Sequence, residues 1–196
     1  MKDLLDSILH AVYCLDLIDI AVLLIIFSLI FIFISSLLIR KPWWRALTAL
    51  MLGLCIGVIA YVTLFGRSGV HYEPCLKLFH SYREMMLTGN REIFRSNFMN
   101  VLLFFPAGLL ASSLLSIKLR PWVCVILVFV VFAPFSGAIE YLQYLYVLGR
   151  PEVDDTMHNA LGSLLGAMDG CIRIHKEKIK KLFLMIKDLM CRDELN

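Results

Sequence analysis

Long apolar runs constrain this chain more than any other feature of its sequence. The clearest covers residues 19–39, DIAVLLIIFSLIFIFISSLLI, and is long enough to cross about 30 Å of hydrocarbon as a helix. Of all residues 60% are hydrophobic and only 18% are charged, against about 25% charged in an ordinary soluble domain. A soluble domain of this composition could not cover its surface with polar groups. The sequence therefore predicts an integral membrane protein built from helices.

The apolar runs predict an all-α, polytopic membrane helix bundle of about five transmembrane helices. The expected spans are residues 19–39, 46–65, 98–117, 122–146 and 156–174. Residues 1–18 form an N-terminal lead-in, residues 19–174 the membrane domain, and residues 175–196 a basic tail. The tail begins within an amphipathic helical pattern at 173–188 that suits an anionic inner leaflet.

The outer loop of this arrangement, residues 66–97, contains a second helical pattern over 75–87, CLKLFHSYREMML. Leu76, Phe79, Arg83 and Met86 recur at helical spacing, which indicates a short amphipathic helix. Two interpretations stay open for it. It lies on the membrane surface, or it is an ordinary loop helix packed on the ends of the spans.

The positions of Lys and Arg orient the chain. Placing the loop at 40–45 inside leaves most Lys and Arg residues on the inner side, as the positive-inside rule requires. With five spans, the N-terminus is then outside and the C-terminus is cytoplasmic. The expected localisation is the plasma membrane, with several passes.

This topology sends the conspicuous polar residues to one side of the membrane. They come from separate parts of the chain: the end of the second span, the start of the third, the outer part of the fourth, and the turn into the fifth. Their convergence at one depth predicts a ligand-binding pocket at the outer leaflet. The candidate residues are Arg67, Asn100, Glu140, Gln143, Arg150, Asp154, Asp155 and Asn159.

Helical spacing indicates on which face of its helix each of these residues lies. Ser136, Glu140 and Gln143 are spaced by four and three, so they share one face of a helix. Asp155 and Asn159 share a face with Gly162 and Gly166 on the next helix. A carboxylate within a span is costly and normally has a partner, for which Arg67 and Arg150 are the available cations beside Glu140.

Structural roles compete with ligand binding at each of these positions. One of Asp154 and Asp155 is expected to cap the last span, while Asn100 and Gln143 would serve equally as interhelical hydrogen bonds. Glu140 could form a structural ion pair. Gly162, Gly166 and Gly170 form a GxxxGxxxG ridge, which is typical of a close helix-packing face.

No motif points to a metal, a cofactor or nucleic acid. His158 could be grouped with Glu140, Asp154 and Asp155, but no HExxH or similar ligand frame accompanies it. The six cysteines form no CxxC pair. Basic residues alternate with aromatic ones only at the membrane edges, so no nucleic-acid surface is indicated. The expected partners are membrane lipids.

Several separated motifs resemble those of the VanZ-like family of bacterial membrane proteins, over about residues 45–172. The motifs agree with the family in order and spacing. Over residues 140–166 the family pattern is Glu-x-x-Gln, Gly-Arg, Asp-Asp-x-x-x-Asn-x-x-Gly-x-x-x-Gly. Two positions depart from the family, Cys75 in place of an aromatic residue and His158 in place of an aliphatic one. The matching segments are FGR (65–67), EPC (73–75), NVLLFFPAGLL (100–110), IEYLQ (139–143), GR (149–150) and DDTMHNALGSLLG (154–166).

The resemblance implies a cell-envelope protein. The family's named member is associated with resistance to the lipoglycopeptide teicoplanin in Gram-positive bacteria, so the pocket is expected to take a lipidated glycopeptide, an envelope lipid or a lipid-linked cell-wall precursor. Two alternatives stay open. One is a membrane enzyme acting on a lipid-linked precursor, and the other is an accessory subunit that packs through the glycine ridge. The missing nucleophile or metal frame favours binding over catalysis, and the sequence leaves the oligomeric state open.

Overall fold

The computed structural model describes residues 30, 43–64, 73–116 and 118–193, with side chains described as far as His175. The described residues form helices and no named strand, which confirms the all-α prediction. The predicted lead-in 1–18, the predicted span 19–39 apart from Ile30, and the candidate site residue Arg67 lie outside the described residues. The helices are α3 (Trp43–Leu64), α4 (His80–Thr88), α5 (Arg91–Leu115), α6 (Pro121–Leu145) and α7 (Val153–Asp193).

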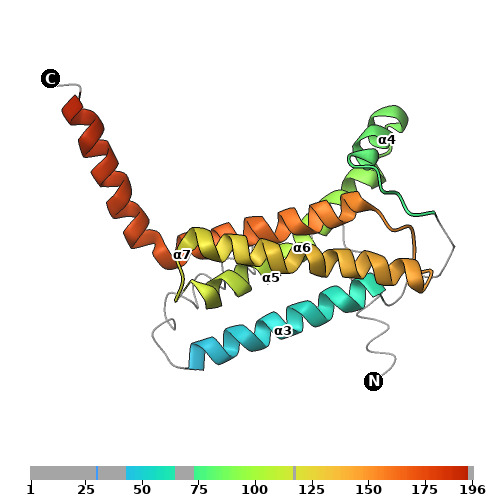
Figure 1. Cartoon of the computed structure of the whole chain (residues 1–196), viewed down its shortest axis with the longest axis horizontal. Helices are drawn as coiled ribbons and strands as arrows, with labels where there is room; N and C mark the ends of the chain where they lie inside the picture. The colour runs from blue at the N-terminus through green and yellow to red at the C-terminus, as the bar shows by residue number, and fades with distance from the viewer. Residues whose placement is uncertain (1–29, 31–42, 65–72, 117, 194–196) are drawn as a thin grey trace.

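Three of these helices are long and apolar enough to cross a membrane by length and composition. They are α3, with 22 residues, and α5 and α6, with 25 residues each. Each lies over one of the predicted spans. The predicted span 156–174 falls within α7, which also runs through the predicted tail as one helix of 41 residues. Figure 1 shows the C-terminal part of α7 projecting away from the other helices.

Local chemistry explains where the helices differ from the predicted boundaries. α5 begins at Arg91 rather than near residue 98 because the Asn90 side chain accepts the backbone N–H of Glu92 at 2.9 Å and caps the helix. α4 covers only the later part of the pattern at 75–87. It starts after Phe79, whose φ of 60° is left-handed, and it ends at Gly89 with a φ of 65°.

The closest helix packing joins α5 and α7 and depends on residues without side chains. A Cβ atom added to Gly162 or Gly166 would overlap the backbone of α5, at the carbonyl groups of Val101 and Phe105 respectively. Gly170 lies against the Ser112 hydroxyl in the same way. On α5, Gly108 meets the carbonyl of Ser163, a contact that the glycine pattern of α7 alone could not reveal. The two backbones therefore approach as in other small-residue helix pairs in membranes.

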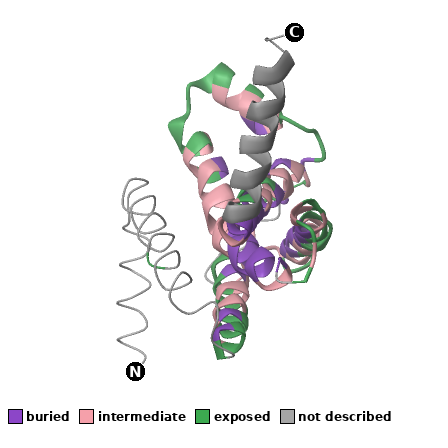
Figure 2. Ribbon diagram, turned by 90° about the vertical axis from the view of Figure 1, so that its left-hand side faces the viewer, coloured by how far each residue is buried: buried purple, intermediate pink, exposed green. Residues whose placement is uncertain are grey.

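The hydrophobic core lies where α3, α5, α6 and α7 meet. Phe104 of α5 is completely buried and contacts the rings of Phe132 and Phe135 of α6, with centroids 6.4 and 6.2 Å apart. Figure 2 shows the buried residues on the inner sides of the helices and the exposed ones on the outside. Large apolar side chains on the outer faces of α3 and α6 are exposed, as expected for helices surrounded by lipid.

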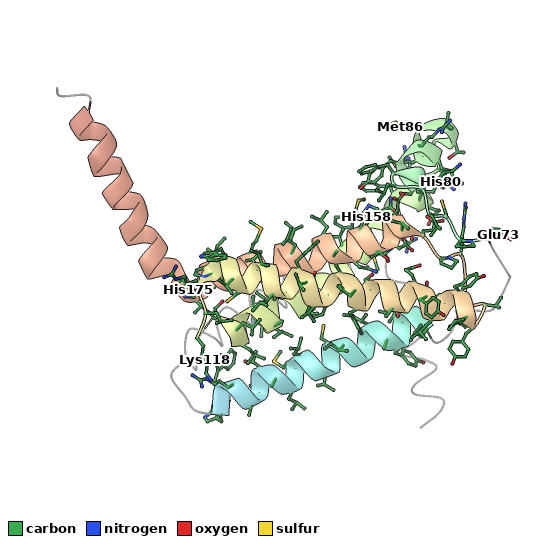
Figure 3. The ribbon with its side chains drawn as sticks, viewed as in Figure 1. Glu73, His80, Met86, Lys118, His158 and His175 are labelled. Carbon is green, nitrogen blue, oxygen red and sulfur yellow. The ribbon has the colours of Figure 1, made fainter. Side chains whose placement is uncertain are left out.

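The helices give the bundle two distinct ends. Figure 3 places Glu73, His80 and His158 at one end, and Lys118 and His175 at the other. The turn between α6 and α7 and the first turn of α7 therefore lie at the same end as α4. This end carries the polar contacts described next, and we call it the α4 end.

Candidate functional site

The α6–α7 turn and the segment before α4 are joined by backbone hydrogen bonds. The Cys75 N–H donates to the carbonyl of Pro151 at 2.9 Å, and the Val153 N–H donates to the carbonyl of Cys75 at 3.1 Å. Together they form an isolated parallel bridge between Cys75 and Glu152. Gly149, with a φ of 148°, provides a conformation in this turn that L side chains rarely adopt. The segment before α4 and the α6–α7 turn, which are distant in sequence, are thus held together.

Asp154 holds the start of α4. Its carboxylate accepts the backbone N–H of Phe79 at 2.7 Å, and both the backbone N–H and the hydroxyl of Ser81 at 2.8 Å. Burial alone would raise the pKa of Asp154, but the hydrogen bonds from Ser81 and Phe79 outweigh it and lower the pKa below its ordinary value. Asp154 thus caps the start of α4, whereas the sequence predicted that it or Asp155 would cap the last span.

A second pair of contacts fixes α4 beside this carboxylate. The Asn97 side-chain N–H of α5 donates to the Ser81 hydroxyl at 3.0 Å. The Tyr82 hydroxyl lies 2.8 Å from Nε2 of His158, which is only 2% exposed. α4 is thus connected through polar side chains to both α5 and α7.

Glu140 anchors the turn that follows α6. Its carboxylate accepts the backbone N–H of Glu152 at 3.0 Å, and the residue is only 9% exposed. Nε of Arg150 lies 3.5 Å from the Glu152 carboxylate, so Arg150 pairs with Glu152 across the turn. Burial raises the pKa of Glu152 above its ordinary value, and the charge of Arg150 opposes that rise.

Gln143 and Asn159 make interhelical hydrogen bonds. The Gln143 side-chain N–H donates to the carbonyl of Thr63 in α3 at 2.9 Å, and that of Asn159 donates to the Ser136 hydroxyl in α6 at 2.8 Å. The structural alternative considered for Gln143 is therefore realised. Their side-chain oxygens have no hydrogen-bond partner among the described residues, so each amide retains an unused acceptor.

The remaining candidates take less central positions. Asn100 is half-buried on α5, and Asp155 is half-buried in the first turn of α7. The structure thus brings Glu140, Arg150 and Asp154 to the joined turn, and places Gln143 and Asn159 deeper between helices. Asp154 accepts hydrogen bonds from α4, a role that its position beside Asp155 in the sequence could not have assigned to it.

A groove of about 360 Å³ opens beside Glu140 and Glu152. Tyr141 and Tyr144 of α6 line one side, and Pro74 and Leu76 of the segment before α4 line another. Its walls are mostly apolar and its polar groups are few, as in many sites for small amphiphiles. Glu152 was not among the predicted pocket residues. Ser81, Tyr82 and Thr63 were not considered as parts of the site because no local pattern marks them.

A larger hollow, of about 480 Å³, lies at the junction of α4 and α5 and is lined by residues such as Met85, Phe94 and Arg95. It contains none of the predicted site residues, so the groove beside Glu140 is the better candidate. Across the residues that the structure describes, no group of three or more His, Cys, Asp or Glu side chains is placed to hold a metal ion.

Comparison with known proteins identifies one relationship. The model of the family described as VanZ/LLP1 matches residues 20–172. That range includes the α6–α7 turn, the glycine ridge and every residue lining the groove. No curated protein and no solved structure matches the chain.

Proposed function

The chain belongs to the VanZ/LLP1 family, and we propose that it binds the polar head of a lipidated glycopeptide or envelope lipid in the groove beside Glu140 and Glu152. One observation carries the proposal: two carboxyl side chains border a mostly apolar groove at the C-terminal end of α6, which is one of the potential membrane spans. An amphiphile with a polar head and an acyl chain has this chemistry. By sequestering such a molecule, the protein would lower susceptibility to teicoplanin-type glycopeptides.

Glu140 and Glu152 form the polar side of the groove, and Arg150 is linked to it through its ion pair with Glu152. Glu140 already accepts one backbone N–H, so its position is fixed before a ligand arrives. Arg150 is 39% exposed and its ion pair with Glu152 is long, at 3.5 Å, so its remaining donors are available to an anionic group of the ligand. Tyr141, which is 61% exposed, and Leu76 extend the apolar wall toward lipid.

Replacing Glu140 by glutamine is expected to weaken ligand binding about tenfold. The hydrogen bond from the ligand's polar head to residue 140 would then be accepted by a neutral amide instead of a charged carboxylate. The Gln carbonyl can still accept the Glu152 N–H, so the turn should keep its shape. The measurement compares susceptibility to teicoplanin and to a non-lipidated glycopeptide in cells expressing either form. Glu92→Gln is the matched control, since Glu92 lies on the exposed first turn of α5, outside the groove. If the wild-type protein changed susceptibility to teicoplanin no more than susceptibility to the non-lipidated glycopeptide, the proposal would be contradicted.

A second function is favoured by the chemistry of the same carboxyl groups. Glu152, with a raised pKa, and Glu140 border one groove, and such a pair can divide the roles of general acid and base. The protein would then act on a lipid-linked cell-wall precursor. Profiling the precursors in the same strains separates the two functions: a pool that changes with wild type but not with Glu140→Gln indicates catalysis, whereas an unchanged pool indicates binding alone.

We propose further that the α4 end faces outward in the plasma membrane, with five spans, an outside N-terminus and a cytoplasmic tail from residue 175. Arg150 and Lys118 lie at opposite ends of α6 and both are exposed. In a cysteine-free background, a membrane-impermeant maleimide should therefore label Arg150→Cys in intact cells and label Lys118→Cys only after permeabilisation. The reverse pattern would refute both the topology and the outer groove.

A further inference from the structure

The segment that contains α4 exposes several large apolar side chains. Leu76 is 75% exposed, Met86 82% and Leu87 76%, and Leu78 and Phe79 are also exposed by more than half. In a water-facing loop such a cluster would be unfavourable, since most large apolar side chains of soluble surfaces occur singly. The inner side of the same segment is polar and makes the hydrogen bonds to Asp154, Asn97 and His158.

Those hydrogen bonds fix the depth of the segment relative to the spans. Ser81 is held by Asp154 in the first turns of α7 and by Asn97 near the start of the apolar part of α5. Cys75 is held by the α6–α7 turn. α4 therefore begins where the apolar helices end. Figure 1 shows α4 above the bundle and no farther to the right than the end of α6.

The exposed apolar surface also continues from a membrane helix onto this segment. Tyr141 and Leu145 at the end of α6 are 61% and 52% exposed, and Tyr141 lines the same groove as Leu76. Lipid that surrounds the end of α6 would therefore meet Leu76 across a groove whose walls are mostly apolar. Lys77 and Arg83 are exposed on the same segment, where long basic side chains can reach the headgroups.

We infer that residues 76–88 form an interfacial arm whose apolar side chains insert into the bilayer leaflet at the α4 end. The arm is fastened to the protein by Asp154, Asn97 and His158 on one side and contacts lipid on the other. In this position the arm would lie in the membrane interface, as other amphipathic interfacial helices do. This contact does not depend on what the groove binds.

Depth-dependent quenching in lipid nanodiscs tests the arm without any added ligand. A cysteine-free protein receives one environment-sensitive fluorophore at residue 87, at residue 86, or at residue 92, whose side chain is 76% exposed on the first turn of α5. Nitroxide groups on the lipid headgroup or high on the acyl chain should quench most of the fluorescence at residues 86 and 87, and much less at residue 92.

Lipid, another protein chain and water around the arm would each give a different result. A fluorophore at residue 87 that lies in an apolar environment but is not quenched by nitroxide lipids would indicate a second copy or another protein, and would overturn the proposal. A fluorophore that is as water-exposed at residue 87 as at residue 92 would also overturn it. As a second readout, Leu87→Glu should reduce the quenching of a fluorophore at residue 86. The variant should keep its fold, because the hydrogen bonds to Asp154 lie on the opposite side of the arm.

Discussion

Replacing Gly166 by alanine is expected to lower the free energy of unfolding by about 3 kcal/mol, at the upper end of the usual range for overpacking. The added Cβ would overlap the carbonyl oxygen of Phe105 and approach the backbone N of Leu109. Backbone atoms inside a helix cannot rotate away as a side chain does, so α5 and α7 would have to separate. Because these two helices form the closest packing in the bundle, the loss should extend to the whole fold.

The measurement is denaturant-induced unfolding of the purified protein in detergent micelles. The matched control is Gly53→Ala in α3, because an added Cβ there meets nothing within 4 Å. That substitution should be neutral or stabilising by up to about 1 kcal/mol, since alanine favours a helix over glycine. Equal stability of the Gly166→Ala and Gly53→Ala variants would refute the close approach of α5 and α7.

Replacing Asp154 by asparagine is expected to release α4 from the bundle at a cost of about 3 kcal/mol in local stability, because charge-assisted hydrogen bonds to a buried carboxylate are lost. The carboxylate accepts three N–H or O–H groups, whereas the amide presents its own N–H groups to one or more of these donors. Phe79 would then lose the contact that holds its left-handed backbone conformation.

Hydrogen exchange provides the readout. The amides of Phe79 and Ser81 should exchange about 150-fold faster in the variant, which is the rate equivalent of that free energy. Glu84→Gln on the same helix is the control, since the Glu84 side chain is 43% exposed and its pair with His80 at 3.6 Å contributes little. If exchange at Phe79 and Ser81 were the same in wild type and variant, the Cys75 bridge and the Tyr82–His158 contact would be sufficient to hold α4.

The same carboxylate gives this contact a defined dependence on pH. The folded-state pKa of Asp154 lies below its ordinary value of 3.8, so its stabilising contribution is fully present above that value and is lost as the pH falls through the folded-state pKa. Glu152 acts with the opposite sign, because its raised pKa favours the protonated form in the folded state. The difference in protection between wild type and Asp154→Asn isolates the contribution of Asp154, and it should stay constant down to about pH 4.

The sequence predicted the helices well because their signals are local. Apolar runs located α3, α5 and α6, and helical spacing placed Ser136, Glu140 and Gln143 on one face, where all three are buried. Spacing also indicated that Gly162, Gly166 and Gly170 share a face. These properties depend on the order of residues along one helix, so no knowledge of neighbouring helices was required.

What the sequence could not decide is which group each polar side chain meets. Asp154 and Ser81 are 73 positions apart, and Gln143 and Thr63 are 80 apart. Periodicity gives the direction in which a side chain leaves its own helix, but the donor it meets depends on how other helices and loops pack. A single predicted pocket was therefore divided by the tertiary structure into three parts: a carboxylate that fastens α4, amides that join helices, and a groove between Glu140 and Glu152. Composition and spacing determined that this is a membrane helix bundle with polar residues at one end, whereas only packing decided which of those residues hold the fold and which border the groove.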